Sequence, residues 1–398
     1  MKTRSRVLAA IGAVVLIGTL LSAPLQAQTP TSYTVRVGAQ FFTRGIPGFS
    51  NRFLPETIRV HEGDTIKFVG TLGSGVSAHA LLPAGVGPTE WREDHQVRPG
   101  NPWFVAQPDP DDGARNQKFN TRVFIPTRFD CGDEANPCGF AGNGVLNGGD
   151  ARRFSVTIQA NPGTVIYAIS MIYASSNFRI EVVPDGRKAS TQAGLDKRAR
   201  ARVHQDYETA AALHNKYSDR KTSHINDKGK RVWDAWAGVD NGNVSLLAMY
   251  PKKLAIEKGD LVQWHFDLES EIHDVAFPFD KALKTAQNSF TPACDPDGDG
   301  GSGPDTPPTA PPPGFCEDPS QLEFDLLNRQ LYSGGNHFFE GRDYENSGLR
   351  GAQALRNGFF SERPYNLKFG AASPEKGFKY FCTFHGPFMG GRVIVNKK

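Results

Sequence analysis

The sequence contains an internal repeat, and this restricts its fold more than any other feature. The segment at 53–70 (FLPETIRVHEGDTIKFVG) aligns without a gap with the segment at 249–266 (MYPKKLAIEKGDLVQWHF). In both segments apolar and polar residues alternate on either side of a Gly-Asp pair, which is typical of two strands around a turn. A His follows in each half, at His79 and His273. The chain must therefore fold the same β unit twice.

The ends of the two halves also match. The segment at 167–183 aligns without a gap with the segment at 380–396. We therefore expect one β domain at 30–185 and a second of the same type at 230–398. The 42 Gly and 28 Pro residues and the short alternating strands favour two antiparallel β-sandwiches.

A helical linker is expected between the domains, at 186–229. Residues 189–220 are rich in Ala, Arg, Lys and Glu, and apolar residues recur there at partly helical spacing. The members of this stripe are Leu195, Val203, Tyr207, Ala210, Leu213 and Tyr217. The basic run DKRARAR could attract an acidic partner, but a solvated helix face is the simpler interpretation.

The first 27 residues resemble a secretory signal. Lys2, Arg4 and Arg6 precede an apolar run at 7–21, and small residues lead to a predicted cleavage after Ala27. An uncleaved membrane anchor is the alternative, although the apolar run is short for a span. We expect a periplasmic or secreted protein with no membrane span after signal removal.

The net charge argues against nucleic acid as a partner. The chain has 45 Lys+Arg and 42 Asp+Glu residues, and three of the basic residues lie in the signal. The remaining chain is therefore about neutral, without the basic excess that binding to phosphates requires.

The five cysteines are informative in an oxidising compartment. Cys131 and Cys138 flank one Gly- and Pro-containing loop, and Cys294 and Cys316 flank another. We expect each pair to form a disulfide across its loop. Cys382 is left without a partner, so it needs another role, such as binding a metal.

The second half gathers residues suited to a redox metal. Cys382, His385 and Met389 follow one another at Cys-x2-His-x3-Met spacing, and His273 lies upstream. One thiolate, two imidazoles and a weak thioether suit a copper ion, because the thiolate favours Cu(I) while the imidazoles serve both oxidation states. A buried thiol, a surface His and a core Met are the structural alternative.

These features resemble the cupredoxin family of blue copper proteins. The resemblance comprises the Gly-Asp strand pair, the upstream His, and Tyr-x-Cys-x2-His followed by Met and Gly-x-Val. It implies Greek-key sandwiches and one-electron transfer. It also implies a type 1 copper ion with His273, Cys382 and His385 as equatorial ligands and Met389 as the axial ligand. The family usually has two or four residues between the second His and Met, whereas this chain has three.

The first half lacks most of these ligands. Ile169, Ile172 and Ser176 align with Cys382, His385 and Met389, so only His79 remains. Without a soft ligand this half cannot hold type 1 copper. The predicted cofactor is therefore a single copper ion in the second half.

We expect an electron carrier rather than an enzyme, and no residue is assigned a catalytic role. The ten His residues include no His-x-His pair of the kind that multicopper oxidases need. The redox partner would be a protein, such as a cytochrome or a copper enzyme, and the oligomeric state stays open. A copper-sequestering or partner-binding module is the main alternative, and an oxidoreductase that uses the long inserts is another.

Two further motifs in the second half resemble ligand sites less closely. Asp295, Asp297 and Asp299 alternate as in a calcium loop, but the position that an EF-hand fills with Glu holds Thr306. We expect a solvated acidic loop there. His337 lies in the insert between His273 and Cys382 and is expected to be a loop residue rather than a ligand.

Overall fold

The computed structural model describes residues 29–70, 79–82, 85–89, 116–118, 141–142, 153–170, 175–287, 291–294, 322–327, 333–351, 361 and 363–397. Three predictions fall on residues outside these ranges. They are the signal at 1–27, the disulfide Cys131–Cys138, and the acidic loop at Asp295, Asp297 and Asp299. Of the predicted disulfide Cys294–Cys316, only Cys294 is described. Among the described helices, none has the length and apolar character needed to cross a membrane.

The described residues of the first half form two facing sheets. One contains β1 (Ser32–Thr43), β2 (Ile46–Leu54), β4 (Thr65–Gly70) and β8 (Arg153–Thr157). The other contains β3 (Thr57–Val60), β5 (His79–Leu81), β7 (Ala141–Gly142), β9 (Val165–Ser170) and β10 (Asn177–Val182). Alternate side chains of both sheets are buried in one apolar core, with Phe53, Phe68 and Phe178 packed together.

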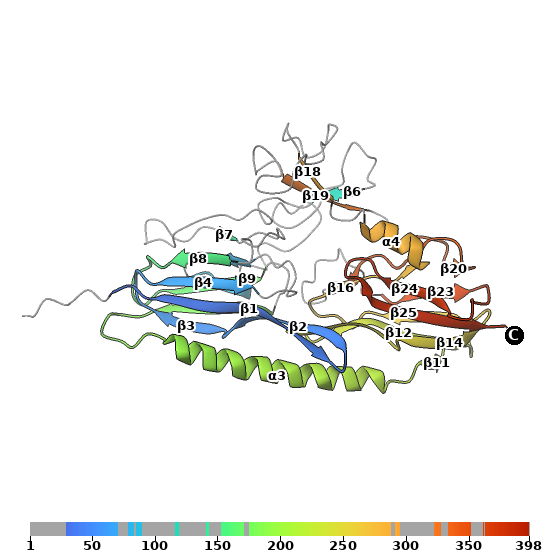
Figure 1. Cartoon of the computed structure of the whole chain (residues 1–398), viewed down its shortest axis with the longest axis horizontal. Coiled ribbons are helices and arrows are strands. Elements are labelled where there is room, and N and C mark those ends of the chain that lie inside the picture. The colour runs from blue at the N-terminus through green and yellow to red at the C-terminus, as the bar shows by residue number, and fades with distance from the viewer. Residues whose placement is uncertain are drawn as a thin grey trace, which may run out of the picture.

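The second half repeats this sandwich (Figure 1). Its first sheet contains β11 (Ser223–Ile225), β12 (Arg231–Asp240), β13 (Val244–Tyr250), β15 (Leu261–His265), β20 (Phe338–Phe339) and β23 (Tyr365–Phe369). Its second contains β14 (Lys253–Glu257), β17 (Ala276–Phe277), β21 (Glu345–Asn346), β24 (Phe378–Cys382) and β25 (Gly386–Asn396). The core between them is aromatic, centred on Trp264, Phe277 and Tyr380.

The predicted mainly β sandwich class is confirmed, and the sheets are mixed rather than purely antiparallel. The strands that flank each Gly-Asp pair do not pair with each other. Strand β3 joins β10, whereas β4 joins β1, and both of these pairs are parallel. In the second half, β14 likewise pairs with β25 and β15 pairs with β12, both in parallel. The turn therefore crosses from one sheet to the other instead of closing a hairpin.

The repeated Asp explains why the turn recurs in the sequence. The Asp64 carboxylate accepts hydrogen bonds from the backbone N–H groups of Thr31 and His61, both at 2.7 Å. The Asp260 carboxylate accepts from Glu257 N–H at 3.0 Å and from the Trp233 indole at 2.7 Å. Each carboxylate thus satisfies donors at the turn and ties it to the neighbouring strand.

The two halves share one continuous sheet. Strand β2 of the first half pairs antiparallel with β13 of the second, so Ser50, Phe49 and Gly48 lie opposite Val244, Ser245 and Leu246. The resulting ten-stranded sheet runs from β20 to β8. The sequence predicted two separate sandwiches linked by a helix and did not predict this edge-to-edge joint.

Helix α3 (Gln192–Ser218) packs along the joint (Figure 1). It begins after Thr191, whose side chain accepts a hydrogen bond from Gly194 N–H at 3.2 Å. Its buried residues recur at helical spacing as Leu195, Ala199, Asp206, Ala210 and Tyr217. Leu195 joins the core of the first half, whereas Tyr217 packs on Trp236 of the second. The helix therefore holds both halves.

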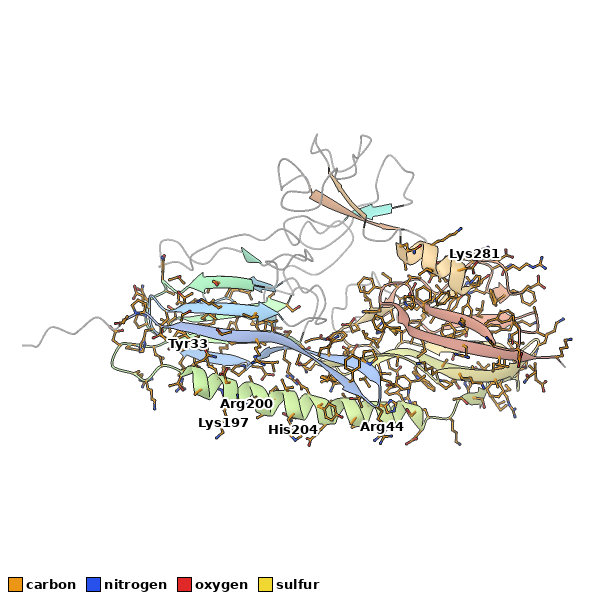
Figure 2. All side chains as sticks on the ribbon, viewed as in Figure 1. Tyr33, Arg44, Lys197, Arg200, His204 and Lys281 are labelled. Carbon is orange, nitrogen blue, oxygen red and sulfur yellow. The ribbon has the colours of Figure 1, made fainter. Side chains whose placement is uncertain are left out.

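The outer face of α3 is polar. Lys197, Arg200 and His204 point away from the sheets, as expected for the basic run (Figure 2). Arg202 instead reaches Glu56 at 3.0 Å. Tyr207, which the apolar stripe included, is 43% exposed, because the buried stripe passes through its neighbour Asp206.

The smaller elements lie around the second half. Helix α4 (Phe279–Gln287) packs on β17 and β24. Strand β16 (Ile272–His273) pairs with β22 (Arg350–Gly351). A three-stranded sheet combines β6 (Asn116–Lys118), β18 (Thr291–Cys294) and β19 (Leu322–Leu327), and therefore connects inserts from both halves.

Asp206 is the polar anchor of α3. Its buried carboxylate accepts from the Ser50 hydroxyl at 2.7 Å and from Arg52 Nε at 3.2 Å. We expect Asp206→Ala to lower the free energy of unfolding by about 1–3 kcal/mol, because a buried hydroxyl loses its acceptor. Urea denaturation measures this. Glu208→Ala, on the exposed face, should change it by less than about 0.5 kcal/mol, and equal effects of the two substitutions would contradict the anchor.

Candidate metal centre

The four predicted site residues lie at one end of the second sandwich. Cys382 is the last residue of β24, His385 lies in the turn that follows, and Met389 lies on β25. His273 comes from β16, a strand outside the main sheets. Residues more than a hundred positions apart thus reach the same end of the fold.

Three of these residues aim their ligand atoms at one point. His273 Nδ1 lies 2.9 Å from His385 Nδ1. Cys382 Sγ lies 3.8 Å from His273 Nδ1 and 3.5 Å from His385 Nδ1. Among the described residues this is the one group of three or more His, Cys, Asp or Glu side chains close enough to share a metal ion. The atoms form a small triangle that one ion can fill.

Burial acts differently on the Cys382 thiol and on the His273 imidazole. Cys382 and His273 are fully buried. Burial raises the pKa of the Cys382 thiol, and the Asp274 carboxylate raises it further, so a metal must displace the thiol proton. Burial, together with His385, lowers the pKa of His273, which keeps this ring neutral and its nitrogen lone pair available.

Asp274 ties the two ligand-bearing segments together. Its backbone N–H donates to Cys382 Sγ at 3.4 Å. Its carboxylate accepts from the Thr383 backbone N–H and from the Thr383 hydroxyl, both at 2.5 Å. The residue after His273 is therefore bonded both to Cys382 and to the residue after Cys382, which fixes the separation of thiol and imidazole.

Gly238 provides the space that His273 occupies. It lies at a bulge of β12 with a φ of 70°, and a Cβ atom there would lie 2.2 Å from His273 Nε2. Any side chain would therefore overlap the ring. His273 Nε2 is buried and has no hydrogen-bond partner among the described residues, so shape alone confines this side of the imidazole.

His385 is held differently. Its side chain is 13% exposed, and its Nε2 lies 3.4 Å from Oε2 of Glu271, whose side chain is 3% exposed. The loop that carries Glu271 is fixed by the buried Asp240 carboxylate. Asp240 accepts backbone N–H bonds from Glu269, Ser270 and Glu271 at 3.0–3.1 Å.

Met389 is fully buried and belongs to the same core cluster as Cys382. Next to it the surface is apolar, because Pro387 is exposed and Phe388 is 58% exposed. The thioether is thus in the apolar interior of the second half, while Pro387 and Phe388 face solvent.

The first half has no matching cluster among its described residues. The backbone of His79 lies on β5, next to Ser170 of β9. Ile169 and Ser176 are buried, and Ile172 lies outside the described residues. In the second half, His265 forms a hydrogen bond with Asp234, and His337 forms one with the Asn366 carbonyl. Neither His belongs to the metal cluster.

Sequence reasoning missed four residues around the centre: Asp240, Gly238, Glu271 and Asp274. Glu271 and Asp274 flank His273 closely in the sequence, as Glu-Ile-His-Asp, and this spacing was available as a signal. Gly238 aligns with Gly38, which lies at a similar bulge of β1 with a φ of 74°. A shared glycine in the two halves could therefore have marked the bulge, but not its contact with His273.

The donor set fits a soft or borderline transition metal. One thiolate and two imidazoles suit copper or zinc, and a trigonal His₂Cys set with a weak thioether is the arrangement of blue copper sites. Structural zinc sites instead use four N or S ligands from Cys and His in a tetrahedron. The cluster among the described residues has three Cys and His ligands. One buried carboxylate oxygen of Glu271 has no hydrogen-bond partner among the described residues, which also favours positive charge nearby.

Comparison with known proteins gives structural neighbours only. No family model matches the chain, and no curated protein matches it significantly. Auracyanin A, a "blue" copper protein from Chloroflexus aurantiacus, is 16% identical, with 42% of this chain and 98% of that chain covered and a TM-score of 0.19. Copper nitrite reductase from Nitrosomonas europaea is 12% identical, with 92% and 94% covered and a TM-score of 0.18. With such low TM-scores, what the site holds must follow from its own residues.

Gly238→Ala tests the packing of His273. The new methyl group would displace the ring, so we expect metal affinity to fall by about 10- to 100-fold or more. The measurement is a titration of the reduced protein with Co(II), followed by its thiolate absorption. Gly38→Ala is the matched control, since it adds similar left-handed strain of about 1–2 kcal/mol far from the ligands. Wild-type affinity in Gly238→Ala would contradict this account of the site.

Proposed function

We propose that this protein is an exported one-electron carrier with a single type 1 copper ion in its second half. The observation that supports this most is the convergence of His273 Nδ1, His385 Nδ1 and Cys382 Sγ within 3.8 Å of one another. Met389 is proposed as the axial ligand. Bound copper would supply one-electron redox chemistry, and the chain's own residues would set the geometry and the route.

The ligand-bearing residues are held so that little has to move. Cys382 lies in the aromatic core, His273 is fully buried, and Asp274 links their segments. Because the segments that carry Cys382 and His273 are tied together through Asp274, the ligand geometry should change little with oxidation state, and electron transfer then needs little reorganisation. This rigidity supports electron transfer over a role in transient storage.

His385 is the proposed route for the electron. It is the one imidazole of the pair with an exposed edge, because His273 is fully buried. Pro387 and Phe388 beside it form an apolar exposed rim. Such a rim suits brief contact with a redox partner protein, such as a cytochrome or a copper enzyme.

The proposal also includes the cellular compartment of the protein. Export by the segment at 1–27 would place the protein in the periplasm or outside the cell, where disulfides at Cys131–Cys138 and Cys294–Cys316 are stable. Cys382 is free in the structure, as a copper ligand must be.

The visible spectrum tests the copper site. Copper-loaded protein should show the intense Cys–Cu(II) absorption of blue copper, and Cys382→Ser should abolish it because no other soft anion can replace the thiolate. The measurement is the absorption spectrum after Cu(II) is added to metal-free protein. A colourless copper complex of the wild-type protein would refute the site, and an unchanged band in Cys382→Ser would exclude this cysteine.

Substitution of Met389 tests the axial ligand. Met389→Leu should keep the colour but raise the reduction potential, because a more apolar surrounding without the thioether favours Cu(I). Protein-film voltammetry measures the shift. Met249→Leu, a buried methionine of β13, is the control. The same potential in wild type and Met389→Leu would mean that another group is axial.

Electron exchange distinguishes a carrier from a sequestering module. The reduced protein should pass its electron rapidly to a small oxidised cytochrome, measured by stopped-flow absorption. Phe388→Glu should slow this second-order reaction without changing the copper spectrum, because it places charge on the apolar rim. Very slow exchange by a fully blue wild-type protein would favour the copper-sequestering alternative.

A further inference from the structure

We propose that Glu271 is a positioning residue for the copper centre: its buried carboxylate accepts the Nε2–H of His385 and so orients that ligand and favours Cu(II). This inference rests on the proposed copper site and deepens it by assigning a residue that sets its potential. The sequence motif does not include Glu271, and its role follows from the contacts of the described residues.

The tautomer of His385 gives the first argument. His385 directs Nδ1 towards Cys382 Sγ and His273 Nδ1, so this nitrogen must be unprotonated to bind a metal. A neutral imidazole then carries its proton on Nε2. Glu271 Oε2 lies 3.4 Å from this atom, within ion-pair distance, and we infer that it is the acceptor for this proton. A carboxylate at this position fixes both the tautomer and the ring orientation.

The burial of Glu271 gives the second argument. Its side chain is 3% exposed, and within the described residues its one ion pair is with His385. Its other oxygen, Oε1, has no hydrogen-bond partner there. The nearby buried Arg350 donates to Ser347, Ser361 and Arg363 instead. A buried carboxylate with so few partners is costly unless positive charge lies beside it.

Charge balance explains the preference for Cu(II). The Glu271 carboxylate and the Cys382 thiolate place negative charge beside the ion, in addition to the buried Asp274 carboxylate that faces the thiol. Buried negative charge is stabilised more by Cu(II) than by Cu(I), because in a low-dielectric environment the attraction grows with the charge of the ion. Glu271 should therefore lower the reduction potential of the centre.

The chain holds Glu271 in place through its backbone. The N–H groups of Glu269, Ser270 and Glu271 all donate to the Asp240 carboxylate. The Ser270 hydroxyl also donates to the Gly242 carbonyl at 2.9 Å. The loop before His273 is thus clamped to the end of β12, and the Glu271 side chain is presented to His385 from a fixed base.

The experiment compares copper-loaded Glu271→Gln with Glu269→Gln. Glu269 is exposed and lies two residues away in the same loop, so its substitution removes an equal charge without touching His385. We expect Glu271→Gln to keep the blue colour and to weaken Cu(II) binding about tenfold relative to Cu(I). For a one-electron couple this raises the potential by about 59 mV. Glu269→Gln should cause a much smaller shift.

A second measurement uses the wild-type protein and so does not depend on a variant that folds. In the diamagnetic Cu(I) form, ¹⁵N-detected NMR should show a proton on His385 Nε2 that exchanges slowly with water. Rapid exchange of this proton, or its absence, would overturn the proposal.

The outcomes separate this inference from the proposed function. If wild-type copper protein is not blue, the proposed function fails. If wild type is blue but Glu271→Gln and Glu269→Gln shift the potential equally, the proposed function stands and the role of Glu271 is refuted.

Discussion

The fully buried carboxylate of Asp274 is the interaction on which the candidate centre depends. His273 lies on the short strand β16, which pairs only with β22 among the described strands, whereas Cys382 ends a strand of the second sheet of the sandwich. The two short bonds from Thr383 to Asp274 close the gap between them. This link acts together with the pairing of Ala276 on β17 with Phe381 on β24, so side-chain and backbone contacts both fix the separation of thiol and imidazole.

Each ligand is fixed by a different physical means, and this makes the site rigid. Cys382 receives a backbone hydrogen bond from Asp274, His273 fits against Gly238, and His385 faces the carboxylate of Glu271. A hydrogen bond, a steric fit and a charge respond differently to a change in metal oxidation state. The steric and backbone restraints stay the same when the charge changes, whereas the Glu271 carboxylate interacts directly with that charge and can therefore contribute to the potential.

The sequence predicted the parts of the site that are local or repeated. Cys382, His385 and Met389 follow one another around a single turn, and His273 follows the repeated Gly-Asp strand pair, as His79 does in the first half. The contacts that hold these residues were not predictable, because they join distant segments: Gly238 meets His273 only after β12 and β16 are folded together. The pairing of β2 with β13 was not predictable for the same reason. The alternation of apolar and polar residues shows which face of a strand is buried, but not which strand lies beside it.

The joint between the halves extends to the metal centre through a chain of contacts. Asn51 of β2 donates to the Asn243 carbonyl at 2.9 Å, and Ser175 of the first half donates to the Gly242 carbonyl. Gly242 N–H in turn donates to Asp240, which fixes the loop that carries Glu271. The first half therefore supports one wall of the centre although it contributes no ligand atom to the cluster. This contact explains why a second copy of the fold, with Ile169 buried where the other half has Cys382, is still useful to the structure. It supports the loop from outside the half that carries the candidate centre.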